Sequence, residues 1–315
     1  MPLEGLGTAV ANGLIEGIFY GSVLGAVAVG LTLIWGVMKV VNLAHGHLAV
    51  FGGMLAANLV IMRGSDPLLL FLAFLVLGAV MGFILYYASI HKIIGKIDII
   101  TLKEEMATLM TTFGFGIALF GFHYVAPRIF QGYSTEPGIT YSLKIAGVST
   151  IDLGFAVVPV KRIIVALLGL LVALASYYLV QRTTLGLMIQ AVAQDSRALA
   201  LVGINPVMIK LATTVISASL ATASGVLYLV YTSSISPTAE FILAPLSFVI
   251  VVLGGLGNIL GTYIGGLILG VIYEVTLYST SVFLGTQQQA IALAVAFAIL
   301  VVMLVFRPQG LFGKR

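Results

Sequence analysis

Long apolar runs are the feature that most limits what this chain can fold into. Ile163–Val180 and Ala290–Phe306 contain no charged residue, and about 20 apolar residues let a helix cross a bilayer. Such unbroken runs exclude an outer-membrane β-barrel, whose strands alternate polar and apolar residues. Charged residues make up 8% of the 315-residue chain, against about 25% in a soluble domain. We therefore predict an all-α, polytopic transmembrane helical bundle whose solvent is the lipid bilayer.

Nine apolar segments are visible in what we expect to be a single transmembrane domain over residues 1–315. Those near 43–62 and 243–256 are short and interrupted by glycine. We therefore expect eight or nine membrane segments, of which one or two are broken or re-entrant. The segments are 8–34, 43–62, 68–90, 106–126, 162–180, 211–231, 243–256, 263–283 and 288–306.

The basic residues indicate membrane orientation rather than nucleic-acid binding. With the N-terminus outside and the C-terminus in the cytoplasm, ten Lys and Arg residues fall inside and five outside, as the positive-inside rule requires. They are scattered at the ends of apolar runs, so the net charge of +4 does not predict a nucleic-acid partner. The inner set is Lys39, Lys92, Lys96, Lys103, Arg182, Arg197, Lys210, Arg307, Lys314 and Arg315, and the outer set is Arg63, Arg128, Lys144, Lys161 and Arg162.

Two loops between the apolar segments are long. The outer loop, residues 127–160, contains Tyr141 to Asp152, which has the pattern of a strand, a turn and a strand. We expect an extracytoplasmic hairpin there. The inner loop, residues 182–210, is polar and rich in helix formers, which predicts short cytoplasmic helices.

The inner loop carries an amphipathic helix. Four apolar residues share one face at helical spacing, an acid and a base begin a second turn, and a glycine ends it. Such a helix without a core of its own needs a partner groove, whereas a helix lying on lipid would carry more Lys and Arg. We therefore favour docking to a partner. The apolar face is Leu185, Met188, Ile189 and Val192, the second turn begins at Asp195 and Arg197, and the glycine is Gly203.

Polar residues occur where the second membrane segment should begin. Asn42, His45, Gly46 and His47 lie close together there, and such side chains are costly in hydrocarbon unless they face a partner or water. One interpretation is a polar helix cap with packing histidines. The other is a place on a transport path, and the sequence leaves both open.

A second candidate lies in the glycine-rich stretch Val252–Gly261. Gly254, Gly255 and Gly257 are dense enough to break a helix, and Asn258 is able to pair the freed backbone groups. Broken helices near the membrane midplane present backbone dipoles to polar solutes in many transporters. We therefore place these four residues on the candidate path.

Glu274 is the clearest acid within an apolar segment. A carboxylate buried in lipid is a functional hypothesis by default, so Glu274 joins the candidate path. A purely structural role, with the carboxyl group protonated or paired with a neighbouring tyrosine, is equally open.

Glycines also recur at four-residue intervals in two series, Gly17, Gly21 and Gly25, and Gly257, Gly261 and Gly265. Each series leaves one helix face without side chains, so that two backbones can approach closely. Ordinary helix packing is the first interpretation, and sliding of the two faces during gating is the second.

Nucleotide-binding and catalytic motifs are missing from the sequence. There is no Gly-x-x-x-x-Gly-Lys-[Ser/Thr] to cradle ATP phosphates. Neither His-Glu-x-x-His nor Gly-x-Ser-x-Gly occurs, and with no cysteine there is no thiol nucleophile or disulfide. We expect no catalytic residue, no metal site and no cofactor bound by this chain.

Seven blocks follow one another along the chain: Asn12–Tyr20, Gly30–Gly46, Arg182–Gly186, Ala191–Asp195, Gly203–Asn205, Gly254–Gly261 and Phe306–Phe312. In this order they resemble the LivH-type permeases of branched-chain amino acid ABC importers. The resemblance covers nearly the whole chain. It implies a permease subunit located in the cytoplasmic (inner) membrane of a bacterium or archaeon.

The resemblance also implies partners. These would be a second, LivM-like permease subunit in a heterodimer, two cytoplasmic ABC ATPase subunits that use ATP, and an extracytoplasmic solute-binding protein. The ATPase-coupling helix of the family falls on Gly186 to Gly203, and the 127–160 loop becomes a contact for the binding protein. The expected function is import of branched-chain or other amino acids by alternating access.

Two alternatives stay open. One is the permease of a urea or short-amide ABC importer, because the same resemblance covers such systems. The other is an ion-coupled secondary transporter, which would need more membrane-embedded acids and bases than one firm mid-span carboxylate.

Overall fold

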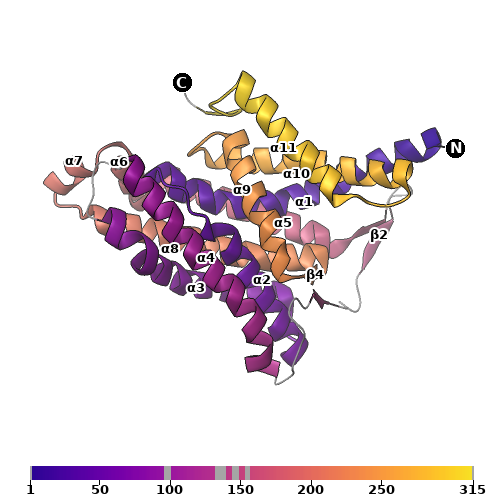
Figure 1. The fold of residues 1–315 in the computed structure, drawn as a ribbon, viewed down its shortest axis with the longest axis horizontal. Coiled ribbons are helices and arrows are strands. Elements are labelled where there is room, and N and C mark those ends of the chain that lie inside the picture. Colours follow the sequence, from indigo (N-terminus) through magenta and orange to yellow (C-terminus); the bar gives the residue numbers. More distant parts are fainter. Residues whose placement is uncertain (1, 96–100, 132–139, 144–148, 153–156, 314–315) are drawn as a thin grey trace.

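A computed structural model describes residues 2–95, 101–131, 140–143, 149–152 and 157–313. Long helices packed side by side form nearly all of it (Figure 1). The helices are α1 Pro2–Met38, α2 Ala44–Arg63, α3 Pro67–Leu85, the π-helix η1 Tyr86–Gly95, α4 Leu102–Gln131, α5 Val160–Arg182, α6 Thr184–Gln194, α7 Ser196–Leu201, α8 Pro206–Thr232, the 3-10 helix η2 Pro237–Ala239, α9 Glu240–Gly254, α10 Ile259–Leu284 and α11 Gln289–Phe306. The strands are β1 Tyr141–Ser142, β2 Thr150–Asp152, β3 Val157–Pro159 and β4 Ser234–Ile235.

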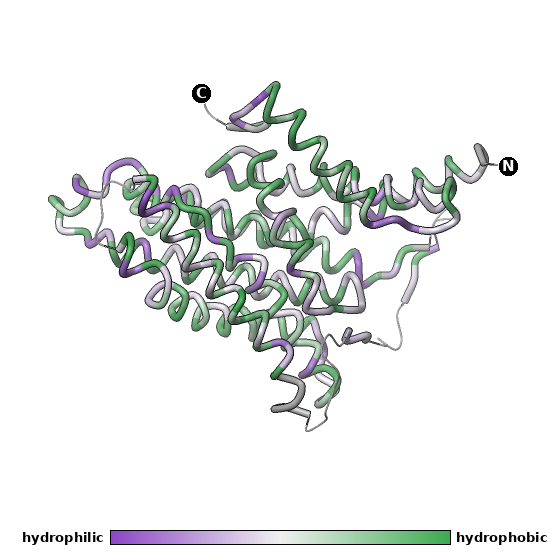
Figure 2. Tube along the Cα trace, in the orientation of Figure 1, coloured by the Kyte–Doolittle hydropathy of each residue, from purple (hydrophilic) through white to green (hydrophobic). Residues whose placement is uncertain are grey.

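The predicted class of fold is confirmed. Within the described ranges, nine helical segments are long and apolar enough to cross a membrane, and each overlaps one of the nine segments expected from the sequence. Figure 2 shows hydrophobic residues along the lengths of these helices and hydrophilic residues gathered in several of their connections. Apolar side chains on α3, α4, α5 and α11 face outward, as a lipid-facing surface requires.

Local sequence signals set several helix starts. Asp66 caps α3 by accepting a hydrogen bond from Leu68 N at 2.8 Å, ahead of Pro67 in the first turn. Asn205 and Pro206 begin α8 in the same way, and Asn258 caps α10 by accepting from Gly261 N. Side-chain caps and an early proline satisfy or remove N–H groups that a helix start leaves unpaired.

The long helix α1 forms the centre of the bundle, and α10 packs along it. A Cβ atom on Gly21 would lie 2.7 Å from both Gly266 O and Leu267 Cα, closer than carbon atoms approach without displacement. Gly17 and Gly270 make a similar backbone contact. These glycines are therefore packing residues, as the first interpretation of their spacing predicted. In the second series, Gly261 and Gly265 instead face α9.

The bundle has two ends, which we name by their contents. The α6 end carries α6, α7, the end of α1 at Met38 and the turn between α9 and α10, since Gly257 lies against Gly36. The strand end carries the four short strands. In Figure 1 the α6 end lies at the left and the strand end at the right.

Helix α2 begins inside the bundle rather than at its α6 end. His45, in its first turn, lies against Gly30 of α1 and Ser217 of α8. Gly30 precedes the end of α1 at Met38 by eight residues, about 12 Å of helix. Residues 39–43 therefore run back into the bundle before α2 starts.

Helix α9 also begins in the interior, since Glu240 in its first turn faces His47 of α2. Its 15 residues extend about 22 Å, short of the roughly 30 Å hydrocarbon core. The partly buried segment β4–η2 leads the chain inward from the end of α8. The expectation of two short interrupted segments thus corresponds to two helices whose N-termini lie at depth and point in opposite directions.

The expectation of a hairpin between Tyr141 and Asp152 is wrong, because its two strands pair with other strands. Strand β1 pairs antiparallel with β4, with Tyr141 opposite Ile235, and β2 pairs with β3, with Ile151 opposite Val158. The reason is burial: Tyr141 and Ile235 are buried together against α2, a gain that a surface hairpin would not provide. Residues 144–148, at the centre of the expected turn, lie outside the described residues.

Candidate functional site

The start of α2 gathers polar groups within the membrane-spanning bundle. Asn42 is buried; its Oδ1 accepts from Ala44 N at 3.1 Å, while its Nδ2 has no hydrogen-bond partner. Leu43 N donates to Thr112 Oγ1 of α4 at 3.3 Å. The connection that enters α2 is thus held by its own side chain and by α4, and it retains one unused donor.

His45 behaves as a packing histidine. Its Nε2 lies 2.7 Å from Val27 O of α1, which fits an N–H donating to a carbonyl, and its Nδ1 lies 3.5 Å from Ser217 Oγ of α8. The ring is fully buried. These contacts join α1, α2 and α8, so the structural interpretation of His45 is favoured.

His47 occupies a different environment. Its Nδ1 lies 3.1 Å from Leu43 O, and its Nε2 lies 3.5 Å from Glu240 Oε1 of α9. Glu240 is 1% exposed, and neither carboxylate oxygen has a hydrogen-bond donor among the described residues. Gly116 of α4 lies directly over the imidazole. A buried carboxylate with so few donors is a costly arrangement, which marks this pair as a candidate site.

An apolar pocket lies further along α2, between α2 and α4, and neither His47 nor Glu240 lines it. His123 of α4 lines it, with a buried ring 6.1 Å from that of Phe51 and an Nε2 that has no partner. The free volume is only about 10 Å³, about the least that admits one water molecule. The pocket is closed in this conformation. Its other lining residues are Phe51, Met54, Leu55, Asn58 and Phe122.

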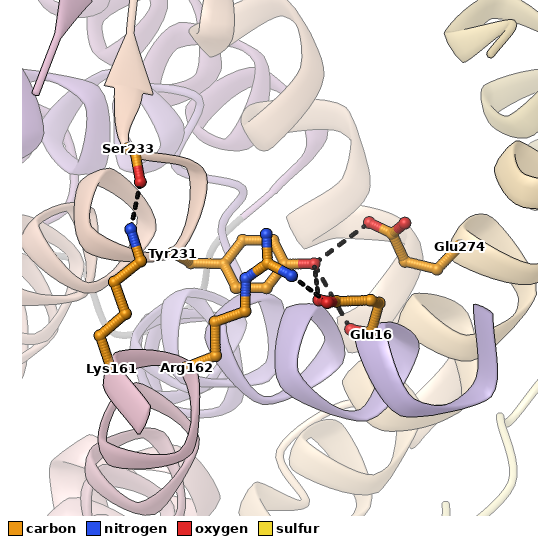
Figure 3. Close-up of polar contacts among 6 residues, drawn as sticks. All are labelled: Glu16, Lys161, Arg162, Tyr231, Ser233 and Glu274. Carbon is orange, nitrogen blue, oxygen red and sulfur yellow. Dashed lines mark hydrogen bonds and ion pairs between the residues drawn. The ribbon is translucent and has the colours of Figure 1, made fainter. Parts of the chain in front are cut away.

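Glu274 belongs to a second polar cluster, nearer the strand end (Figure 3). Arg162 of α5 forms an ion pair with Glu16 of α1, and its guanidinium lies 5.1 Å from the ring centroid of Tyr231. The Tyr231 hydroxyl donates to Glu16 Oε2 at 3.2 Å and lies 3.4 Å from Glu274 Oε1. One hydroxyl thus joins both carboxylates, and the cluster ties α1, α5, α8 and α10 together.

Aromatic rings surround this second cluster. Tyr20 stacks on Tyr231 at 5.4 Å and tilts against Tyr273 at 5.3 Å. Lys161, next to Arg162, donates to Ser233 at the end of α8. The tyrosine pairing foreseen as a structural role for Glu274 is therefore present.

Gly254, Gly255, Gly257 and Asn258 form the turn between α9 and α10 at the α6 end, away from both clusters. Gly255 and Gly257 have φ of 98° and 79°, a region that glycine enters without strain. Asn258 Nδ2 donates to Phe312 O, and Leu311 N donates to Leu253 O. The C-terminal segment thus closes this turn. The structure places the predicted path residues in three separate regions, and their part in a path stays a prediction.

The inner loop folds into the two short helices expected, but its apolar face has a different role. Ile189 and Val192 are buried in one core cluster with Met38 of α1 and Leu48 of α2. The prediction that this face waits for a partner is wrong, because residues of its own chain cover it. Gly186 is also buried, with α5 backbone against it. Met188 packs at the edge of the same cluster.

The exposed part of the loop is α7 and the turn after it. Leu201 and Val202 are 89% and 73% exposed, and α7 projects at the far left of Figure 1. A cavity of about 620 Å³ lies beside α7 and includes Asp195, Arg197 and Lys39 in its lining. Gly203 ends the helix with φ of 84°, as the sequence predicted.

Sequence reasoning missed four residues of these clusters: Glu240, His123, Arg162 and Tyr231. Glu240 stands just before the apolar segment expected at 243–256, and Arg162 at the edge of another, so each has the pattern of an end charge. His123 is a lone polar residue inside a span, and such residues are functional hypotheses by default. The position of His123 within an apolar segment was therefore the sequence signal that could have identified it.

Fold and site together define a polytopic membrane protein with polar clusters buried between its spans. The chain matches the family described as branched-chain amino acid transport system / permease component over residues 13–304. It belongs to that family.

Three relatives illustrate the similarity. The high-affinity branched-chain amino acid transport system permease protein LivH of Salmonella typhimurium is 26% identical over 304 residues, covering 96% of this chain and 94% of the relative. The corresponding protein BraD of Pseudomonas aeruginosa is 28% identical, covering 96% and 95%. The probable branched-chain amino acid transport permease protein LivH of Methanocaldococcus jannaschii is 25% identical, covering 95% and 92%. No solved structure matches the chain.

Proposed function

We propose that this chain is one permease subunit of an ATP-driven importer that carries branched-chain amino acids across the cytoplasmic membrane of a bacterium or archaeon. Membership of the permease family carries the proposal. The partners we propose are a second, LivM-like permease, two cytoplasmic ATPase subunits and an extracytoplasmic solute-binding protein. The chain itself acts as a transport subunit, with no ATP site of its own.

The helix α7 supports the ATPase contact. Leu201 and Val202 expose apolar side chains beside Asp195 and Arg197 at the α6 end. An apolar centre with charged neighbours is typical of a protein interface. We propose that the ATPase seats against α7, while α6 anchors it to the permease.

The core behind α6 offers a route for transmitting ATPase motion. Ile189 and Val192 pack in the same cluster as Met38 at the end of α1 and Leu48 in α2. A push on α7 therefore reaches the segment 39–43 and the buried start of α2 through packed side chains. In this mechanism the two permeases rock between outward-facing and inward-facing states, and the solute passes between them by alternating access.

Membrane orientation follows from the same assignment. The α6 end carries the ATPase contact, so it faces the cytoplasm, and the strand end faces outward. The odd number of spans among the described residues, nine, supports an N-terminus outside and a C-terminus inside, and so does the distribution of basic residues. The strands of the 127–160 loop become the contact for the binding protein.

Reconstitution tests the proposal. The complete complex in proteoliposomes should take up labelled leucine only with ATP inside and binding protein outside, and a protonophore should not stop it. Uptake that persists when the ATPase subunits are inactivated, or that collapses with the proton gradient, would instead favour an ion-coupled transporter. Uptake of urea in place of leucine would contradict the solute assignment.

A further inference from the structure

We propose that Glu240 and His47 form the place where this permease binds the ammonium group of the amino acid that it transports. The inference rests on the proposed function and adds a binding site to it. It names the ligand chemistry as a primary ammonium on a small aliphatic molecule. The glycine-rich turn at Gly254–Asn258 does not offer such a site, because Asn258 Nδ2 donates to Phe312 O. The second cluster does not offer one either, because Glu16 and Glu274 already have ion-pair or hydrogen-bond partners.

The hydrogen positions at His47 follow from its neighbours. A backbone carbonyl only accepts hydrogen bonds, so the contact between His47 Nδ1 and Leu43 O places a hydrogen on Nδ1. In the neutral ring, Nε2 is then an acceptor. It faces Glu240 Oε1 at 3.5 Å, and a carboxylate also only accepts. Two acceptors face each other, and a group with several N–H donors would satisfy both.

Burial makes the unused acceptors significant. Glu240 is 99% buried and His47 94% buried, and among the described residues neither carboxylate oxygen nor His47 Nε2 has a hydrogen-bond partner. Leaving such groups unpaired in a low-dielectric interior costs several kcal/mol, so their presence in a native protein needs an explanation, and a ligand that completes them is one. An ammonium supplies three donors and the compensating positive charge.

The surroundings fit the rest of an amino acid zwitterion. Asn42 Nδ2 is a buried donor without a partner at the start of α2, and α2 has neither an acidic residue in its first turn nor a side-chain cap on Leu43. The positive end of a helix dipole favours a carboxylate. About one to two helical turns along α2 from His47, Phe51 and Met54 line the apolar pocket together with Phe122 of α4, which suits an aliphatic side chain.

The site is closed in this conformation, because His47 and Glu240 are both buried and the apolar pocket further along α2 has only about 10 Å³ of free volume. Helix α4 covers it and packs chiefly on α2 and η1, while its other face exposes Met110, Phe113 and Ile117. Movement of α4 away from α9 would open the pair without breaking the core formed by α1, α8 and α10. Among the described residues, no group of three or more His, Cys, Asp or Glu side chains is placed to hold a metal ion.

Saturation-transfer difference NMR on the complete complex in nanodiscs tests the proposal, because it detects the weak binding expected of a path site. The probes are leucine, isopentylamine, which lacks the carboxylate, and 4-methylpentanoate, which lacks the ammonium. We expect saturation transfer to leucine and isopentylamine and little to 4-methylpentanoate. Glu240→Gln should weaken the binding of both amines at least tenfold, and Glu240→Asp, which keeps the charge, should weaken it less.

Glu104→Gln, near the α6 end of α4, is the matched control and should bind as the unchanged protein does. His47→Gln serves as a second variant if Glu240→Gln does not assemble; it should also weaken amine binding. Equal binding of leucine by Glu240→Gln and the unchanged complex overturns the proposal, as does equal binding of 4-methylpentanoate and isopentylamine. These two overturning results are the ones expected if Glu240 and His47 only share a proton and bind no amine.

ATP-dependent uptake by the unchanged complex is measured in parallel, which separates the two hypotheses. Uptake that requires ATP together with unaltered binding by Glu240→Gln refutes the ammonium site and leaves the importer intact. Loss of ATP dependence in the unchanged complex refutes the importer, whatever the Glu240 variants do.

Discussion

His47 Nε2 on α2 lies 3.5 Å from Glu240 Oε1 on α9, and both residues stand in the first turn of a helix that begins inside the bundle. The chain enters α2 through residues 39–43 and enters α9 through β4 and η2. Two helix starts at depth bring helix dipoles and polar side chains into the membrane interior, an arrangement that the discontinuous helices of transporters also have. The remaining spans hold these two starts in position.

The glycine contact between α1 and α10 predicts a large effect from a small change. Gly21→Ala places a methyl group 2.7 Å from Gly266 O, so the two helices must separate. Overpacking of this kind lowers the free energy of unfolding by about 1–3 kcal/mol. Thermal unfolding followed by fluorescence-detected size exclusion in detergent would measure it. Gly7→Ala, on the same helix with nothing within 4 Å of the new atom, should unfold no earlier than the unchanged protein.

Loss of the Arg162 side chain should destabilise the bundle, because Glu16 loses its ion-pair partner. Arg162→Gln leaves Glu16 and Glu274 together beside Tyr231 without the cation. Removing one partner of a buried ion pair costs about 3–5 kcal/mol, and we expect about 2–3 kcal/mol because the Arg162 side chain is 27% exposed. The double variant Arg162→Gln with Glu16→Gln should recover part of the loss. A double-mutant cycle of melting temperatures checks this, and independent additive losses would show that the pair does not interact.

A substitution at Leu201 distinguishes an effect on docking of the ATPase subunits from an effect on folding of the permease. It is 89% exposed, so Leu201→Asp should change the free energy of unfolding by less than about 0.5 kcal/mol. On the proposed function, the variant should nevertheless lose most co-purification of the ATPase subunits and most stimulated ATP hydrolysis. Ile189→Ala, at a buried position of α6, should instead destabilise the permease by about 2–5 kcal/mol. Normal ATPase recovery with Leu201→Asp would remove α7 from the contact.

Disulfide crosslinking distinguishes the observed strand pairing from the expected hairpin. The chain has no cysteine, so introduced pairs give an unambiguous signal. Ser142→Cys with Ser234→Cys should crosslink under mild oxidation, since these residues are opposite each other in β1 and β4 and disulfides form between Cβ atoms about 4 Å apart. Ser142→Cys with Thr150→Cys should not. Mobility on non-reducing gels reads out both, and the reverse pattern would restore the hairpin.

Single cysteines also test the orientation of the protein. Thr150 lies at the strand end and Gln194 at the α6 end, and both side chains are exposed. In cells whose outer barrier has been removed and whose cytoplasmic membrane is intact, an impermeant maleimide should label Thr150→Cys without further treatment. It should label Gln194→Cys only after the membrane is opened. Labelling in the opposite order would invert the topology and place the α6 end outside.

Much of the fold could be predicted because each helix that spans the lipid bilayer must consist of a run of apolar residues. Ile163–Val180 is a helix for that reason, and so are the other segments of the nine. The spacing of Gly17, Gly21 and Gly25 indicated a packing face, which α10 occupies. Capping residues such as Asn205 marked helix starts through local hydrogen bonds. These features depend on neighbours a few residues apart.

Only the tertiary structure determined which residues distant in sequence contact one another. The sequence placed Asn42 and His47 at the start of a span, but not Glu240 beside His47, because a charge at the edge of an apolar run has the pattern of an end residue. The apolar face of α6 showed amphipathicity without showing that α1, α5 and α8 pack against it, and β1 pairs with β4 rather than with β2. Hydrophobic periodicity records that a face is buried, while packing geometry alone determines which surface buries it.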